Sequence, residues 1–433
     1  MGGYLETQTQ VNKSFGYFMV LWAGEWISSI GSGMTAFVLG VYVYQMTGTA
    51  SSVAMVTLCA FLPIIILGPV GGVLADRFDR RLMMIIGDLF SAFGLLFILI
   101  AMLLGEPALW QICIGVMFSS MFVSLLEPAY KATITDLLTE EQFAKASGLV
   151  QLAGASKYLL SPIIAGILFT IMDVSKILII DIATFFITLF AVFFVKRNLR
   201  AIQKTRMKVT FVKDLKDGWD IFIASQGVLQ ITMILSIVTF YMGLLQTLFT
   251  PMLLSYMNSR TLGTIMSISA SGMLIGSLII GIFNIKRNYI TVLSIGLSFA
   301  GIFFSLLGIT TNIFFLSVFG FIFFAALPFI NTSADVMIRR KISSEAQGRA
   351  WGIIGILSQL GYVASYALAG ILADFVFNPL LREGGPLVPA FGNIIGIGEG
   401  RGTGLLFIVS GFLIVILSLI IPHIKSIRAL ENT

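Results

Sequence analysis

The feature that most constrains this sequence is a series of apolar runs that recurs from one end of the chain to the other. Each run is close to the ~20 residues that a helix rising ~1.5 Å per residue needs to cross ~30 Å of hydrocarbon. Only 11% of the residues are charged, whereas an ordinary soluble domain has about 25%. Because no water-soluble fold can hide so much apolar surface, we expect a polytopic membrane protein.

We predict twelve membrane-spanning helices and an all-α fold, because helices satisfy their own backbone hydrogen bonds in lipid. The first apolar run leads directly into a longer span and not into a cleavage site, so we interpret the start of the chain as mature protein. The predicted spans are 16–46, 51–75, 82–104, 109–135, 142–171, 175–195, 222–256, 260–284, 288–308, 312–338, 345–377 and 403–424.

The positions of Lys and Arg predict the orientation, because cytoplasmic loops carry an excess of both. With both termini in the cytoplasm, four of the 27 basic residues lie outside and Lys157 lies within a helix. The four are Lys176, Arg260, Arg382 and Arg401. The opposite orientation would place the basic stretch 196–216 on the wrong side. We therefore expect a multi-pass protein of the plasma (cytoplasmic) membrane with cytoplasmic termini.

The basic stretch divides the chain into an N-terminal six-helix bundle (1–195), a cytoplasmic linker (196–221) and a C-terminal six-helix bundle (222–433). At a fixed offset of 204 residues, the run 165–168 matches 369–372, and Gly68, Gly72 and Leu74 fall on Gly272, Gly276 and Leu278. Two parallel halves are the internal symmetry of one large class of transporters. We expect two pseudo-symmetric bundles, and a monomer, because each half supplies the other's partner surface.

A charged motif follows the second predicted helix. Residues 72–81 read Gly-Val-Leu-Ala-Asp-Arg-Phe-Asp-Arg-Arg, with Gly72, Asp76, Arg77 and Arg80 at the motif positions. This run resembles the GxLaDRxGRK signature of the major facilitator superfamily, with Asp79 in place of the second Gly. The second half lacks the Asp-Arg pair.

A second motif lies in the fifth predicted helix and resembles the antiporter motif of drug:proton exporters. Its residues are Gly148, Ser161, Pro162, Ala165 and Gly166, with Lys157, Ser161 and Ala165 in place of glycines. Segments 377–379 and 396–402 are similar to a loop of the macrolide-efflux type of exporter. The resemblance implies a major facilitator fold (two six-helix bundles) and drug:proton antiport, and it leaves the substrate open.

Charges at membrane depth indicate where a polar passage lies, because a bare charge near the bilayer centre costs at least ~2.5–3.5 kcal/mol. Glu25 lies about 13 Å into the first helix and shares a face with Ser28, Ser29 and Ser32. This stripe either lines a central cavity, which we favour, or consists of a carboxyl bonded to helix-packing serines.

The other candidates for proton coupling are Glu127, Lys131, Lys157 and Asp181. Glu127 and Lys131 lie one helical turn apart, so they either neutralise each other or exchange partners when Glu127 takes up a proton. Lys157 either reaches an interface by extending its side chain or pairs with Glu127 or Glu25. Asp181 lies close to the outer surface, where interfacial solvation would account for it.

At the cytoplasmic face, we expect Asp76, Arg80 and Asp136 to form a charge cluster that holds the second and fourth helices against the eleventh. By resemblance this cluster is a conformational gate, and the alternative is a static clamp. Asp335 occupies the position that a lysine has in the first half. It either makes the halves asymmetric or pairs with Arg339, four residues later.

The first, seventh and tenth predicted helices carry aromatic and polar side chains suited to an apolar pocket with few polar contacts. In a chain with 37 Phe, most aromatic residues must face lipid or the core. The candidates for contact with a substrate are Trp22, Trp26, Ser29, Tyr241, Gln246, Phe329 and Asn331.

The leading hypothesis is a secondary active transporter that exports lipophilic or amphipathic compounds, such as macrolide-like drugs, by proton antiport through alternating access. This activity would confer antibiotic resistance, with the proton gradient as the energy source and no cofactor. The alternatives are a transporter of lysophospholipids or siderophores and a membrane sensor that binds a ligand without moving it.

An enzyme is not expected, because the sequence has no HExxH, GxSxG or Walker motif. Cys59 and Cys113 stand singly, which argues against a metal site. The basic linker is better suited to an anionic membrane surface than to nucleic acid. The expected partners are a small lipophilic substrate, protons and the lipid bilayer.

Overall fold

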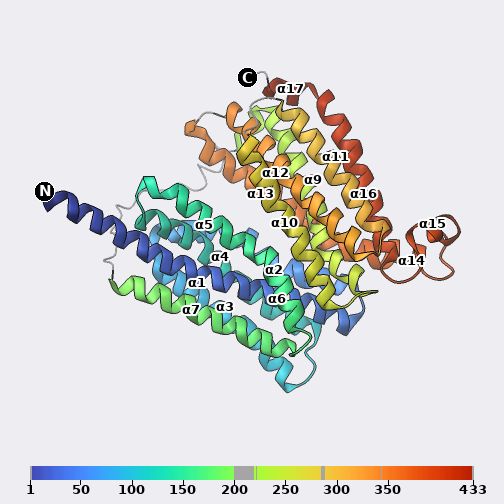
Figure 1. Cartoon of the computed structure of the whole chain (residues 1–433), viewed down its shortest axis with the longest axis horizontal. Helices are drawn as coiled ribbons and strands as arrows, with labels where there is room; N and C mark the ends of the chain where they lie inside the picture. Colours follow the sequence, from blue (N-terminus) through green and yellow to red (C-terminus); the bar gives the residue numbers. More distant parts are fainter. Residues whose placement is uncertain (1, 199–218, 221, 284–287, 343, 432–433) are drawn as a thin grey trace. The chain divides into compact units, whose positions relative to one another are not determined.

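The computed structural model describes residues 2–198, 219–220, 222–283, 288–342 and 344–431 (Figure 1). In these ranges the chain is helical almost throughout and has no β-strand. Twelve helices of the described chain are long and apolar enough to cross a membrane. The prediction of an all-α membrane protein with twelve spans is confirmed.

The Cα positions group into two units. One comprises Met1–Val43 and Val56–Met207, and the other comprises Tyr44–Met55 and Lys208–Thr433. The sequence did not predict that residues 44–55, which end the first helix and begin the second, belong with the second unit. Most of the predicted linker, including the possible amphipathic stretch from 211, lies outside the described residues.

Residues 2–198 form seven helices, which are drawn in Figure 1. They are α1 (Gly2–Thr47), α2 (Ala50–Arg77), α3 (Arg80–Leu104), α4 (Leu109–Leu137), α5 (Glu140–Leu159), α6 (Ser161–Leu168) and α7 (Val174–Asn198). The predicted span 142–171 is thus divided at Leu160 into α5 and α6. Pro162 has no N–H to continue the α-helical ladder, which accounts for the division.

In the described part of the second half, six spanning helices alternate with or precede shorter elements. The long helices are α9 (Gln226–Leu254), α10 (Ser259–Phe283), α11 (Tyr289–Ile309), α12 (Ile313–Lys341) and α13 (Ser344–Ile371), followed by α16 (Arg401–Ile420). The short elements are the π-helical turn η1 (Leu372–Phe377), α14 (Asn378–Leu381), α15 (Val388–Ile395), the 3-10 turn η2 (Ile421–His423) and α17 (Lys425–Glu431). The turn η1 continues α13 to the predicted end of the span at residue 377.

Small residues bring neighbouring helices into close contact in both units. A side chain at Gly272 of α10 would overlap the Phe321 carbonyl oxygen of α12. In the same way, Gly94 of α3 packs against the backbone of α4 at Gly115. Lipid is as apolar as the side chains, so close backbone packing replaces the hydrophobic effect as the driving force between membrane helices.

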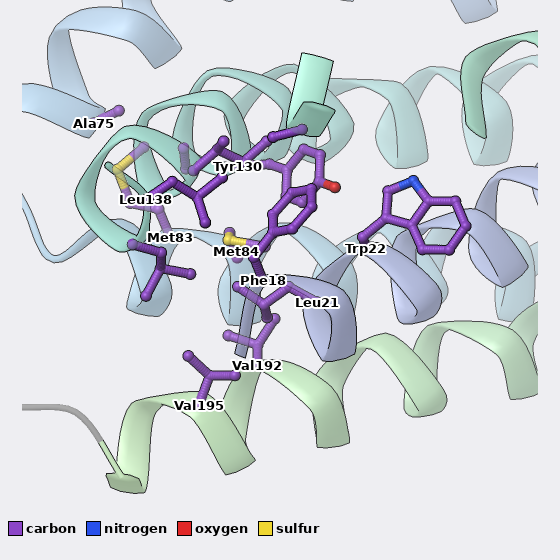
Figure 2. Packing of buried hydrophobic residues seen from close by; sticks show 14 of the residues in the cluster. Phe18, Leu21, Trp22, Ala75, Met83, Met84, Tyr130, Leu138, Val192 and Val195 are labelled. Atoms are coloured by element: carbon purple, nitrogen blue, oxygen red, sulfur yellow. The ribbon is translucent and has the colours of Figure 1, made fainter. Parts of the chain in front are cut away.

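A compact apolar core holds α1 against its neighbours in the first unit (Figure 2). Phe18, Leu21 and Trp22 of α1 pack with Met84 of α3 and Tyr130 of α4. Farther along α1, the Thr188 hydroxyl of α7 donates a hydrogen bond to the Gly24 carbonyl oxygen (3.1 Å). These contacts fix the turn of α1 that carries Glu25.

We expect Gly272→Ala to destabilise the protein by about 1–3 kcal/mol, because overpacking forces the backbones of α10 and α12 apart. Gly281 of the same helix has open space around it, so Gly281→Ala is the matched control and should be neutral or stabilising by up to about 1 kcal/mol. Thermal unfolding of both variants in detergent tests this packing. Equal unfolding midpoints would contradict it.

Candidate functional site

An ion pair open to solvent lies within α4. The Lys131 Nζ and Glu127 Oε1 atoms are 2.7 Å apart, and the two side chains are 63% and 57% exposed. At ~1.5 Å per residue, Glu127 is about 27 Å from the Leu109 end of the helix and about 15 Å from the Leu137 end. A charged pair this exposed at this depth faces water, because acyl chains would reject it. The expected intrahelical pair is therefore present.

Glu25 of α1 is enclosed near this pair. Its Oε2 atom is buried and has no hydrogen-bond partner among the described residues. Glu127 and Lys157 are close enough to act on it electrostatically, with opposite signs. An enclosed carboxyl with neighbours of both signs can change its proton affinity when those neighbours move.

Two tryptophans tie the Glu25 turn to α5. The Trp22 and Trp26 rings stack with centroids 5.3 Å apart. Trp22 Nε1 donates to the Leu149 carbonyl oxygen (2.6 Å), and Trp26 Nε1 donates to Ser156 Oγ (2.8 Å). Trp22 is 8% exposed and belongs to the apolar core, so its predicted contact with a substrate is not apparent in this structure.

Lys157 and Asp181 extend the charged cluster. The Lys157 side chain is exposed and interacts electrostatically with both Glu25 and Asp181. Asp181 is fully buried, and its Oδ1 accepts a hydrogen bond from the Thr184 hydroxyl (3.3 Å). The expected interfacial solvation of Asp181 is therefore wrong, because Gly31 has no side chain and lets α1 close over this carboxyl.

The structure adds a carboxyl that the sequence analysis missed. Asp88 of α3 is 1% exposed, its Oδ2 has no hydrogen-bond partner in the described chain, and Glu25 is its electrostatic neighbour. The Tyr130 hydroxyl is also buried without a partner in the described ranges and is electrostatically coupled to Glu25. Asp88 is the one acidic residue of the predicted span 82–104, and this was the signal to follow.

In the second unit, a cavity of about 390 Å³ opens between α9, α12 and α13. Arg339 Nε lies 2.7 Å from Asp335 Oδ2, which confirms the expected pair between positions four residues apart. The Arg339 guanidinium also lies 5.3 Å from the centroid of the Trp351 ring. The cavity is lined by Leu235, Asn331, Thr332, Asp335 and Trp351.

The remaining substrate candidates do not line this cavity. Tyr241 packs edge-on against Phe304 (centroids 6.2 Å apart), and Gln246 Oε1 accepts a hydrogen bond from the Tyr366 hydroxyl (2.5 Å). Ser29 and Phe329 are half-buried.

The predicted gate is described only in part, because the side chains of Asp76 and Asp136 lie outside the described residues. Arg80 donates hydrogen bonds to the carbonyl oxygens of Ala75 (3.1 Å) and Ala132 (2.9 Å), joining the end of α2 to α4. Asp79, which replaces a motif Gly, caps α3 by accepting from the Arg81 N–H (3.0 Å). The Arg77 side chain is exposed, and Gly72 has open space around it.

Residues of the antiporter motif join α6 to α1. The buried Ser161 hydroxyl donates to the Ile30 carbonyl oxygen (2.9 Å), and Gly33 leaves the space that Ser161 occupies. Pro162, Ala165 and Gly166 are buried, whereas Gly148 has open space around it.

A further carboxyl without a predicted role, Asp374 in η1, caps the start of α2 within the second unit. It accepts hydrogen bonds from the backbone N–H groups of Ala50 (3.2 Å) and Ser51 (2.7 Å) and from the Ser51 hydroxyl (2.6 Å). The backbones of Gly370 and Ser51 are in contact, so a side chain at position 370 would overlap the Ser51 backbone.

Buried polar contacts also order the segment between α13 and α16. Arg401 donates hydrogen bonds to the carbonyl oxygens of Ile395 (2.5 Å) and Ile309 (3.0 Å) and stacks over Tyr256 at 5.8 Å. Burial raises the pKa of the Tyr256 hydroxyl to about 12, and the Arg401 guanidinium opposes part of this rise. Asn378 Oδ1 accepts from the Thr403 N–H (3.0 Å). These contacts therefore anchor both ends of the 377–402 loop.

Twelve apolar helices, a repeat between the halves and ionisable groups within spanning helices define a multi-pass membrane transport protein rather than an enzyme. The model of the Major Facilitator Superfamily matches residues 21–260, more than half of the chain. The chain belongs to the Major Facilitator Superfamily.

Similar proteins agree with this assignment. Macrolide efflux protein A from Streptococcus pyogenes is 26% identical over 419 residues, covering 96% of this chain and 97% of that protein. Enterobactin exporter EntS from Shigella flexneri is 27% identical over 157 residues, covering 36% and 38%. Among solved structures, the nucleoside transporter NupG has a TM-score of 0.74 at 13% identity, covering 94% of this chain and 100% of that one. That likeness shows the fold.

We expect Asp374→Ala to free the backbone N–H groups at the start of α2, because the loss of a side-chain cap costs about 0.5–2 kcal/mol. Hydrogen exchange measured by mass spectrometry should be about 2–30-fold faster for the peptide containing Ala50 and Ser51. Glu383, an exposed acid of the segment after η1, supplies the control Glu383→Ala. Unchanged exchange in Asp374→Ala would show that the cap does not hold this end of α2.

Proposed function

We propose that this protein is a secondary active transporter that exports lipophilic or amphipathic compounds, such as macrolide-like drugs, by proton antiport through alternating access. The observation that carries the proposal is the solvent-open Glu127–Lys131 pair in the middle of a spanning helix, beside the enclosed Glu25 carboxyl. Such an arrangement has no use in a purely structural membrane helix, and it costs free energy unless water reaches it.

Glu25 is the proposed proton carrier. Lys157 and Glu127 act on its charge in opposite directions, so a movement that brings one nearer and takes the other away changes its affinity for protons. The open ion pair gives Glu127 a partner that can be exchanged. Asp88, Asp181 and the Tyr130 hydroxyl are further groups through which a proton can pass within the first unit.

The nature of the substrate is supported by the near full-length similarity to a macrolide efflux protein. A siderophore is the second candidate, because part of the chain is similar to an enterobactin exporter. We further propose that the protein works as a monomer in the plasma membrane. Its termini lie in the cytoplasm in this proposal, because the distribution of Lys and Arg favours that orientation.

In proteoliposomes, we expect a pH gradient to drive the efflux of erythromycin and Glu25→Gln to reduce the gradient-driven part by at least about tenfold, since an amide cannot carry the proton. Asp88→Asn should also slow the gradient-driven efflux, because the proposal gives Asp88 a part in passing the proton. Glu106, an exposed acid in the turn between α3 and α4, supplies the control Glu106→Gln, which should behave as wild type.

The same vesicles loaded with enterobactin distinguish the two kinds of substrate. Erythromycin flux that does not respond to the gradient, in wild type as in Glu25→Gln, would remove the antiport proposal. Gradient-driven flux of enterobactin alone would replace the macrolide with the siderophore.

A further inference from the structure

The cavity between α9, α12 and α13 has the size and lining of a small-molecule site. Its volume of about 390 Å³ falls within the ~300–1,000 Å³ typical of ligand pockets. Leu235 and Trp351 provide apolar surface, whereas Asn331, Thr332 and Asp335 provide polar groups. All five residues belong to the second unit.

A cation that belongs to the protein already uses the recognition groups of this cavity. The Arg339 guanidinium binds the Asp335 carboxylate at 2.7 Å and lies over the Trp351 ring at 5.3 Å. A carboxylate next to an aromatic face is the combination that recognises organic cations, through charge-assisted contact and attraction to the ring quadrupole. Arg339 therefore shows what kind of group fits there.

The pair is open enough to be exchanged. Asp335 is 40% exposed and Arg339 is 55% exposed, and ion pairs with that much solvent contact contribute little to stability. A competing cation with an apolar body would keep the carboxylate and the indole face and could also cover Leu235, which lines the same cavity.

The Trp351 indole ring is partly enclosed. Trp351 Nε1 is buried and has no hydrogen-bond partner among the described residues. The N–H edge of the ring therefore points into the protein, and the part of the ring that lines the cavity offers an apolar and cation-binding surface.

We propose that Asp335, Trp351 and Asn331 form a binding site for the cationic group of lipophilic substrates, in which the ligand displaces Arg339 from Asp335. The proposal rests on the proposed transport function and assigns a chemical class to its substrates: apolar compounds that carry a basic or permanent positive charge. Asp335 is thus a recognition residue in addition to its pairing with Arg339.

Equilibrium binding of radiolabelled tetraphenylphosphonium to the purified full-length protein in detergent tests the site without any gradient. The charge of this probe does not depend on pH. We expect Asp335→Asn to weaken binding by about tenfold, because the carboxylate is lost. Arg339→Gln should instead tighten binding by about three- to tenfold, because the competing cation is gone while the carboxylate stays.

Three controls separate recognition from folding. Asp335→Glu should restore most of the affinity, Glu383→Gln should leave it unchanged, and triphenylphosphine oxide, the neutral analogue, should bind wild type and both charge variants alike. Equal affinity of wild type and Asp335→Asn for tetraphenylphosphonium would overturn the proposal. Weakened binding in Arg339→Gln would also overturn it, since the pair would then be structural.

The outcome is independent of the antiport experiment. Cation binding that follows these changes, together with erythromycin flux that ignores the pH gradient, would support the site and remove proton coupling. Gradient-driven erythromycin flux, together with tetraphenylphosphonium binding that does not respond to the charge variants, would support proton coupling and remove the proposed cation site.

Discussion

A charged side chain in a spanning helix needs either water or an enclosing set of polar partners, and this requirement shapes the polar interior of the protein. Glu127 and Lys131 meet it with solvent, since more than half of each side chain is exposed. Asp181 meets it with a threonine hydroxyl inside the bundle. Glu25, Asp88 and Asp181 each keep one oxygen without a partner among the described residues, and under the proposed mechanism these carboxyls are the groups that exchange protons.

The two halves share a repeated sequence pattern, but the charges are shifted by one helical turn. At the offset of 204 residues, Asn331 falls on Glu127 and Asp335 falls on Lys131. Each half has a solvent-exposed acid paired with the base four residues later, yet the second pair lies one turn farther along its helix. The first half thus places its acid beside other ionisable groups, whereas the second places its acid beside Trp351 in a cavity.

Polar contacts at helix ends help to hold the helices of this protein together. Asp374 satisfies donors at the start of α2, and Arg401 satisfies carbonyl groups at the end of α11. Both are charges that complement the helix dipole, negative at an N-terminus and positive at a C-terminus. Between the ends, glycines such as Gly272 let backbones approach until they touch. In lipid, the stability of the fold therefore depends on close packing of helix backbones and on side chains that satisfy the backbone groups at helix ends.

The sequence by itself determined the membrane class, the number of spans, the repeat and the pairs Glu127–Lys131 and Asp335–Arg339. These depend on hydropathy and on spacing along one helix, which are local properties of the chain. Only the tertiary structure decided which charges are enclosed, because burial depends on what other helices place opposite a side chain. Asp88 lies near Glu25 of α1, and Asp374 binds the start of α2. Asp181 is enclosed because α1 approaches it closely at Gly31. No pattern along a single helix could assign these environments.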